Sequence, residues 1–130
     1  RKDFGSKPML YPMPVLIIGT YGEDGTPNAM NAAWGTSQER DSVVLNLTET
    51  HKTVQNIKAR GAFTVSIADA AHIVEADYFG VESCNKVADK FAHSGLTASK
   101  AETVDSLSST SFRSAWNADS SSIRTVNTDA

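Results

Sequence analysis

The chain has 130 residues, of which 40% are hydrophobic and 21% are charged, and its formal net charge is −3. This length and composition predict one domain, or one domain with a tail. The acidic balance and the lack of a basic run argue against a nucleic-acid partner and against an anionic membrane surface.

Cysteine content and apolar runs bear on the compartment. Cys84 is the single cysteine, which excludes an intrachain disulfide and fits a reducing cytoplasm. The longest apolar stretch, Val15–Ile18, is far too short to span a bilayer, so we expect no membrane segment. The chain starts at Arg1 without a methionine, and we expect a processed or trimmed start. The sequence therefore predicts a cytoplasmic protein.

The first quarter of the chain predicts a β-hairpin behind an irregular segment. Residues 1–14 carry three prolines, which exclude a regular helix and predict an extended course over the surface. Val15–Tyr21 is β-prone and largely apolar, which predicts a strand. Gly22–Thr26 contains Asp-Gly, a strong hairpin signal, and Pro27–Trp34 is the predicted returning strand.

Two further strands are predicted on either side of a helix. A polar turn over Gln38–Asp41 precedes a strand over Ser42–Thr48. Beyond the helix, Ala62–Ala68 alternates in character and places Phe63, Val65 and Ile67 on one face, as expected of a fourth strand.

The helix between these strands has start and stop signals. Thr50 is a natural N-cap, and Gly61 lies where a C-cap glycine belongs, so the helix should run to about Arg60. We expect its core-facing stripe to consist of Val54, Ile57 and Lys58.

After residue 68 the pattern predicts helices and one more strand. A second helix should begin at Asp69 or Ala70 and end near Gly80, a short third helix should cover Asn85–Phe91, and Leu96–Ala101 should form a strand. Residues 105–130 contain eight serines and no regular apolar period, so we expect a poorly ordered or loosely packed tail. The order of elements favours a mainly β, α+β fold with an antiparallel, barrel-like sheet over a doubly wound one.

The start of the first helix has the composition of an anion site. Thr48, His51, Lys52 and Thr53 lie within six residues, beside Thr50. A helix N-terminus presents unpaired N–H groups and the positive end of its dipole, and hydroxyls and an ammonium group could complete a phosphate shell. Lys52 and Thr53 taken alone fit an ordinary solvated helix start equally well, and His51 fits a surface or capping role.

Other chemistry-bearing residues have weaker contexts. His72 and Glu75 stand at helical i, i+3 spacing near Asp69, but two such ligands are common by chance, so we expect no metal site. Cys84 has no activating base beside it. The sequence has no G-x-G-x-x-G dinucleotide fingerprint and no nucleophile-elbow serine, and we assign no catalytic residue.

The ordered segments resemble flavin reductase-like proteins of the flavoredoxin type over residues 1–104. The resemblance rests on residues 3–8, 14–20, 28–35, 51–57, 61–68 and 85–91, which occur in order and at consistent spacing. It implies a split β-barrel that binds FMN non-covalently, a homodimer with flavin sites near the subunit interface, and NAD(P)H as a possible co-substrate. We expect the barrel to be incomplete at its C-terminus, because the family chain normally continues for several more strands.

The resemblance also implies roles for individual residues. Met30, Asn31, Ala32, Ala33 and Trp34 would lie along the isoalloxazine ring, partly through backbone groups. Thr48, His51, Lys52 and Thr53 would hold the ribityl phosphate, and Lys90 would border the flavin or the dimer interface. From the residues alone, the small alanines fit ordinary sheet packing as well as a planar ring, and Trp34 fits a core or interface aromatic.

Three functional hypotheses follow. The first is a flavin-dependent oxidoreductase that passes electrons between NAD(P)H and flavin or another acceptor, for which hydride transfer needs no acid–base residue. The second is a non-enzymatic FMN-binding or electron-transfer module, and the third is an inactive truncated fragment. Because the tail departs from the family pattern, we hypothesise that residues after about Asp105 derive from a shifted reading frame, which resequencing the gene would test.

Overall fold

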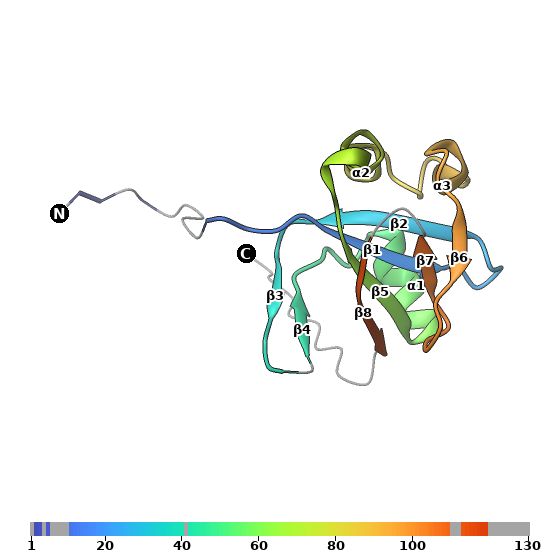
Figure 1. Cartoon of the computed structure of the whole chain (residues 1–130), viewed down its shortest axis with the longest axis horizontal. Helices are drawn as coiled ribbons and strands as arrows, with labels where there is room; N and C mark the ends of the chain where they lie inside the picture. Colours follow the sequence, from blue (N-terminus) through green and yellow to red (C-terminus); the bar gives the residue numbers. More distant parts are fainter. Residues whose placement is uncertain (1, 4, 6–10, 41, 110–112, 120–130) are drawn as a thin grey trace.

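The central sheet is antiparallel and has four strands in the order β2-β1-β5-β8 (Figure 1). These strands are β1 (Leu16–Tyr21), β2 (Pro27–Ala32), β5 (Ala62–Ile67) and β8 (Arg113–Asp119). The computed structural model describes residues 2, 3, 5, 11–40, 42–109 and 113–119, the last stretch by its backbone alone. The predicted hairpin and fourth strand are confirmed.

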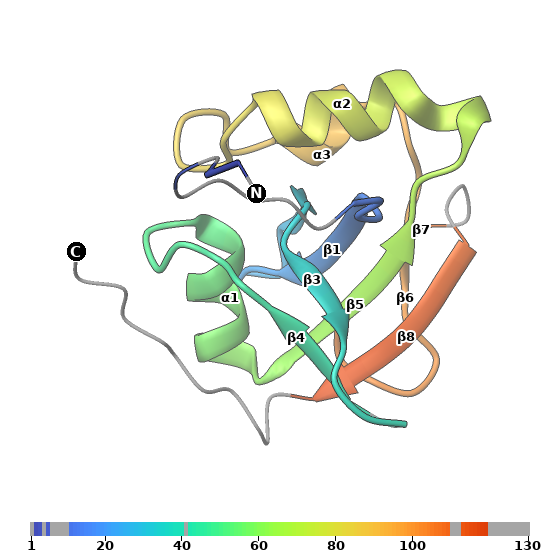
Figure 2. The same ribbon diagram turned by 90° about the vertical axis from the view of Figure 1, so that its left-hand side faces the viewer.

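Within the described residues, two small hairpins and three helices surround this sheet. The hairpins pair β3 (Gly35–Ser37) with β4 (Val43–Leu45) and β6 (Ala98–Lys100) with β7 (Leu107–Ser109). The helices are α1 (Lys52–Arg60), α2 (Ile73–Val81), which follows a short 3₁₀ turn over Ala70–His72, and α3 (Lys90–His93). Figure 2 shows β1 and β5 between α2 on one side and the β3–β4 hairpin on the other.

Strand β1 is buried on both faces because its apolar residues alternate between two cores. Leu16 and Ile18 pack with Ile57 of α1 in one core, which the β3–β4 hairpin also covers. Ile17 packs on the opposite face with Phe79 of α2 and with Phe91. The sheet is therefore covered on both sides, and each side has its own helix.

The hairpin turn and the end of α1 form as their local signals predict. Gly25 and Gly61 adopt φ values of 83° and 71°, a left-handed conformation that glycine accepts without a Cβ clash. Gly61 also donates its N–H to the Ile57 carbonyl and ends α1. The Asp24 carboxylate stabilises the turn by accepting hydrogen bonds from the N–H and the hydroxyl of Thr26.

Three details of α1 and α3 differ from the prediction. His51, not Thr50, is the N-cap residue, and it makes no side-chain cap hydrogen bond. Lys58 is exposed and pairs with Glu49, while Thr53 and Asn56 occupy the buried face beside Ile57. The third helix begins only at Lys90, because residues 85–89 form turns.

The predicted extent of two strands also changes. The third predicted strand shrinks to Val43–Leu45, and it pairs with a strand over Gly35–Ser37 that was not predicted. Three residues give too short a pattern to reveal a period. The last predicted strand is confirmed over Ala98–Lys100.

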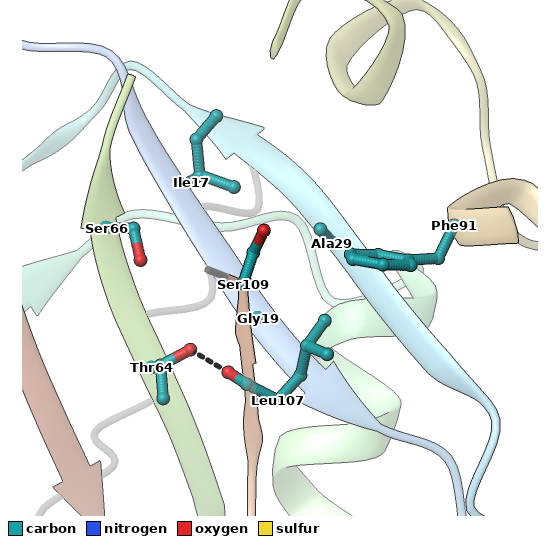
Figure 3. A pocket seen from close by; sticks show the side chains of 8 residues that line it. All are labelled: Ile17, Gly19, Ala29, Thr64, Ser66, Phe91, Leu107 and Ser109. Carbon is teal, nitrogen blue, oxygen red and sulfur yellow. Dashed lines mark hydrogen bonds between the residues drawn. The ribbon is translucent and has the colours of Figure 1, made fainter. Parts of the chain in front are cut away.

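The expectation of a loosely packed tail is wrong for its first residues. Ser106 and Leu107 are only 0% and 2% exposed. Ser106 donates its hydroxyl to the Gly19 carbonyl at 2.9 Å, and the Thr64 hydroxyl bonds the Leu107 carbonyl (Figure 3). A Cβ at Gly19 would lie 2.8 Å from that carbonyl, so glycine permits the close approach. The cavity beside these residues, about 10 Å³, has room for about one water molecule. Residues 120–130 lie outside the described part.

Candidate functional site

The predicted anion-binding residues lie partly on the loop between β4 and α1 and partly at the start of α1. Thr48 and His51 are exposed, and the His51 N–H donates to the Thr48 carbonyl at 3.1 Å. Lys52 is half-buried and starts α1. The carbonyl of Thr50 accepts from Asn85 Nδ2 at 2.9 Å, which ties the loop to the segment after α2.

Behind Lys52 lies a cluster of four buried polar side chains. Asn28 Nδ2 donates to the hydroxyl oxygens of Thr53 at 2.8 Å and Thr20 at 3.3 Å. Asn56 Nδ2 donates to the same Thr20 oxygen at 3.1 Å. Each of the four side chains is at most 3% exposed. As an acceptor in this network, the Thr53 hydroxyl keeps its own proton for a further acceptor.

One atom of this cluster lacks a partner. Asn28 Oδ1 is buried, and no described residue donates to it. An unpaired buried polar group costs about 1–3 kcal/mol, and native proteins leave few of them unexplained. A polar ligand that completed the network would offset this cost.

A groove of about 480 Å³ opens beside the cluster. This volume falls within the range of about 300–1,000 Å³ for small-molecule sites. Lys52 supplies its only lysine or arginine among the described lining residues. The lining consists of Gly22, Glu23, Asp24, Thr26, Asn28, Lys52, Asn56, Cys84, Asn85 and Ala88.

The described lining of the groove contains one cation, Lys52, and two carboxylates, Glu23 and Asp24. Hydrogen bonds from Thr26 hold the pKa of Asp24 below its ordinary value, and the nearby charge of Lys52 adds to this effect. Burial raises the pKa of the Cys84 thiol, which donates to the Ala88 carbonyl at 3.3 Å. Cys84 therefore has the character of a thiol and not of an activated thiolate.

The five residues predicted to lie along a planar ring occupy different environments. Ala32 is 4% exposed and packs in the α1-side core, with Met30 against it. Asn31 is half-buried and faces α2, since a Cβ at Gly80 would lie 2.7 Å from Asn31 Nδ2. Ala33 is exposed, and Trp34 is 51% exposed. Strand β2 is an edge of the described sheet, so its outer backbone groups are unpaired there.

Lys90 stands apart from the other predicted residues. It is 2% exposed, and its Nζ donates to the carbonyls of Phe79 at 3.2 Å and Glu82 at 2.9 Å. The ammonium lies 5.7 Å from the centre of the Phe79 ring, and burial lowers the pKa of Lys90. Lys90 therefore holds the C-terminal end of α2, directly before the groove residues Cys84 and Asn85.

The structure thus places Lys52 in the groove lining and Thr53 in the adjacent buried cluster, and it leaves Thr48 and His51 on the adjoining loop. Sequence reasoning missed Asn28, Asn56 and Asn85. Asn28 shares one face of its strand with Met30 and Ala32, and this polar residue on an otherwise apolar face was the available signal. Asn56 shares a helix face with Thr53, three residues earlier.

Neither a metal site nor a membrane span is present in the described residues. No group of three or more His, Cys, Asp or Glu side chains among them could hold a metal ion. His72 Nδ1 lies 2.8 Å from Asp69 Oδ1, an ion-pair geometry at the start of α2. No described helix is long and apolar enough to cross a bilayer.

The chain belongs to the flavin reductase-like domain family, whose sequence model matches residues 9–112. Its fold is the predicted split β-barrel, with sheets that do not close. The sequence resemblance covered residues 1–104, and the family model matches eight residues further, to residue 112. The origin of residues 105–130 remains a prediction.

Solved structures agree with this assignment. Flavoredoxin of Desulfovibrio vulgaris (Miyazaki F) is 38% identical over 85% of this chain, with a TM-score of 0.79. Flavoredoxin from Methanosarcina acetivorans is 20% identical over 86%, with a TM-score of 0.75. An FMN-binding domain of a flavin reductases-like enzyme from Shewanella baltica is 20% identical over 76%, with a TM-score of 0.70.

These solved chains are longer than this one. The chain spans 61% of the Desulfovibrio protein, 59% of the Methanosarcina protein and 52% of the Shewanella protein. No curated protein sequence matches the chain.

Proposed function

We propose that the chain binds FMN non-covalently and acts as a flavin-dependent oxidoreductase domain. The observation that carries this proposal is the groove beside α1, where a cationic helix start adjoins a buried polar cluster with an unpartnered acceptor. Bound FMN would supply a ring that accepts and donates electrons, and the protein would position that ring and tune its charge.

The cationic and the acidic residues of the groove would contact two parts of the cofactor. Lys52 and the N-terminus of α1 would hold the dianionic phosphate, with Thr48, His51 and the Thr53 hydroxyl around it. Asn28 and Asp24 would accept hydrogen bonds from ribityl hydroxyls.

The ring would lie along β2 from Met30 to Trp34. Because the side chains of Met30 and Ala32 pack inward, these residues would contribute backbone groups of the sheet edge, whereas Ala33 and Trp34 would offer exposed surface. Lys90 would act indirectly, by holding the segment that carries Cys84 and Asn85. NAD(P)H would bind transiently beside the flavin, since the chain has no dinucleotide fingerprint.

The exposed apolar side chains next to β3 and β4 support a homodimer with flavin near its interface. Val15, Trp34 and Val44 are 45%, 51% and 43% exposed. The Asn46 N–H donates to the Trp34 carbonyl at 2.8 Å, which keeps the two hairpin strands together. Sedimentation of the Trp34→Asp variant tests this dimer, which should dissociate. The cytoplasm, where Cys84 would remain reduced, is the proposed compartment.

The 38% sequence identity to a flavoredoxin favours a second candidate, a non-enzymatic flavin-binding electron-transfer module. An absorbance spectrum of the purified protein, with and without added FMN, tests flavin binding for both candidates. NAD(P)H oxidation that increases with added FMN would support the oxidoreductase. Bound flavin without such oxidation would support the electron-transfer module.

Lys52→Ala tests the phosphate role directly. We expect FMN affinity to fall about 10- to 100-fold, equivalent to the 1.5–3 kcal/mol of a charge-assisted hydrogen bond. Riboflavin has no phosphate, and its affinity should stay unchanged. Fluorescence quenching titrations measure both ligands, and Lys58→Ala on the exposed side of the same helix is the matched control. Equal losses of affinity for FMN and riboflavin would show that Lys52 does not bind the phosphate.

A further inference from the structure

Helix α2 is apolar on two opposite faces. Ala76 and Phe79 are 3% and 1% exposed and pack toward the sheet. Val74 and Val81 are 74% and 72% exposed, and at 100° per residue they project from the side opposite Ala76 and Phe79. Ile73, 64% exposed, adjoins them. A helix that is apolar all round is normally buried all round, so the outward face predicts a covering surface.

The surroundings of this face are acidic. Residues 69–85 contain four acidic residues and no lysine or arginine. Asp77 lies between Ile73 and Val81 on the outward side, and it is exposed. None of the ion pairs among the described residues includes Glu75, Asp77 or Glu82. Asp69 pairs with His72, and Glu82 lies near the Lys90 ammonium, which leaves Glu75 and Asp77 without an ion-pair partner among the described residues. Such carboxylates beside an apolar centre define a surface complementary to a basic partner with its own apolar centre.

The charge also argues against two other occupants. A two-fold dimer through this face would bring the same acidic residues of two copies together, which costs Coulomb energy. An anionic lipid surface would be repelled for the same reason.

The face continues into the groove wall. Glu82 follows α2 directly, and Cys84 and Asn85 of the next turn line the groove. Figures 1 and 2 place α2 on the side of the sheet away from the β3–β4 hairpin, so this face is separate from the proposed dimer surface. A partner seated on α2 would therefore lie next to the proposed flavin and leave the dimer surface free.

We propose that the outward face of α2, formed by Ile73, Val74, Asp77 and Val81, docks a protein partner that presents an apolar patch ringed by lysines or arginines. The docked partner is a redox protein that gives electrons to the flavin or takes them from it, and this role rests on the proposed function. The docking itself depends on α2 alone.

A synthetic helix is a direct probe of this surface. A fluorescent peptide of about 14 residues, with leucines on one face and lysines around them, is titrated into the full chain at low salt. A second peptide with glutamates in place of the lysines tests the charge. We expect the lysine peptide to bind, to weaken as salt rises, and to bind at least tenfold better than the glutamate peptide.

Variants of α2 localise the binding. Val74→Asp combined with Val81→Asp should weaken the lysine peptide at least tenfold, and Asp77→Lys alone about threefold. Tyr11→Asp is the matched control because Tyr11 is also 74% exposed, and it should leave binding unchanged. Equal binding by all variants, or no binding by the wild type, would overturn the proposal. A changed sedimentation coefficient of the double variant without peptide would also overturn it, in favour of self-association.

The same samples separate this proposal from the flavin assignment. FMN affinity should be the same in the wild type and the double variant, since neither valine lines the groove. If the protein does not bind FMN but still binds the peptide through α2, the docking surface is supported and the electron exchange is refuted.

Discussion

Helices α1 and α2 flank the same sheet and have nine residues each, but their buried and exposed faces are composed in opposite ways. The buried face of α1 carries Thr53 and Asn56, and its exposed side is charged at Lys58. The buried face of α2 carries Ala76 and Phe79, and its exposed side carries valines. A buried polar group raises the free energy of the folded state unless a hydrogen-bond partner contacts it, and an exposed apolar group does so unless another molecule covers it.

This difference assigns the helices different tasks. The polar inner face of α1 borders a groove that fits a small polar ligand, and the unpartnered Asn28 acceptor lies at that border. The apolar outer face of α2 fits a macromolecular surface. The comparison teaches that residues of the wrong polarity for their position mark the two candidate sites.

Phe79→Ala should have the largest effect on this comparison. Phe79 is 1% exposed and stacks on Phe91 at 5.5 Å between ring centroids, so its removal leaves a cavity in the core. We expect a loss of about 3–5 kcal/mol in the free energy of unfolding, measured by urea denaturation. Val74→Ala on the exposed side should change that free energy by less than about 0.5 kcal/mol. A comparable loss from Val74→Ala would mean that the outer face of α2 is already covered.

Local signals explain which parts of the fold could be predicted. The Asp24-Gly25 turn and the Gly61 C-cap depend on the conformational preferences of one or two residues, and both were predicted correctly. The alternation of Phe63 and Val65 also needs no distant partner. The position of Lys52 at the groove is that of a residue at a helix start, and its role toward a ligand stays a prediction.

Features that depend on distant contacts were not predictable in this way. Asn56 rather than Lys58 is buried because its amide meets Thr20, 36 residues away. Ser106 and Leu107 enter the core because Gly19 leaves space for their backbone, and no pattern within the serine-rich tail shows this. The outward apolar face of α2 was hidden because both sides of the helix carry the same residue type.

Thr53→Val tests the buried polar face of α1. Valine keeps the shape of threonine but removes the acceptor of the 2.8 Å hydrogen bond from Asn28. We expect a loss of about 1–2 kcal/mol in the free energy of unfolding and a roughly tenfold weaker FMN affinity. Thr36→Val, on the exposed strand β3, is the control and should change neither quantity. Unchanged FMN affinity in a destabilised Thr53→Val protein would limit Thr53 to a structural role.

Asp69→Asn should give the smallest effect, at the start of α2. Asp69 accepts from the His72 N–H at 3.0 Å, and the hydrogen bond with the His72 side chain is the main cause that lowers the pKa of Asp69. A carboxylate with a lowered pKa stabilises the folded state above its unfolded pKa of about 3.9 and loses this contribution as the pH falls through the folded value. Asparagine keeps the acceptor oxygen and removes the charge.

The urea midpoint of Asp69→Asn should therefore lie slightly below that of the wild type at about pH 7, and the difference should shrink as the pH falls below about 3.9 and through the folded pKa of Asp69. Asp77→Asn, on the outward side of the same helix, is the matched control, because Asp77 forms no ion pair with a described residue. A difference that persists unchanged at the lower pH would show that Asp69 acts through geometry and not through charge. In that case the start of α2, like its outer face, would owe little of its stability to electrostatics within the chain.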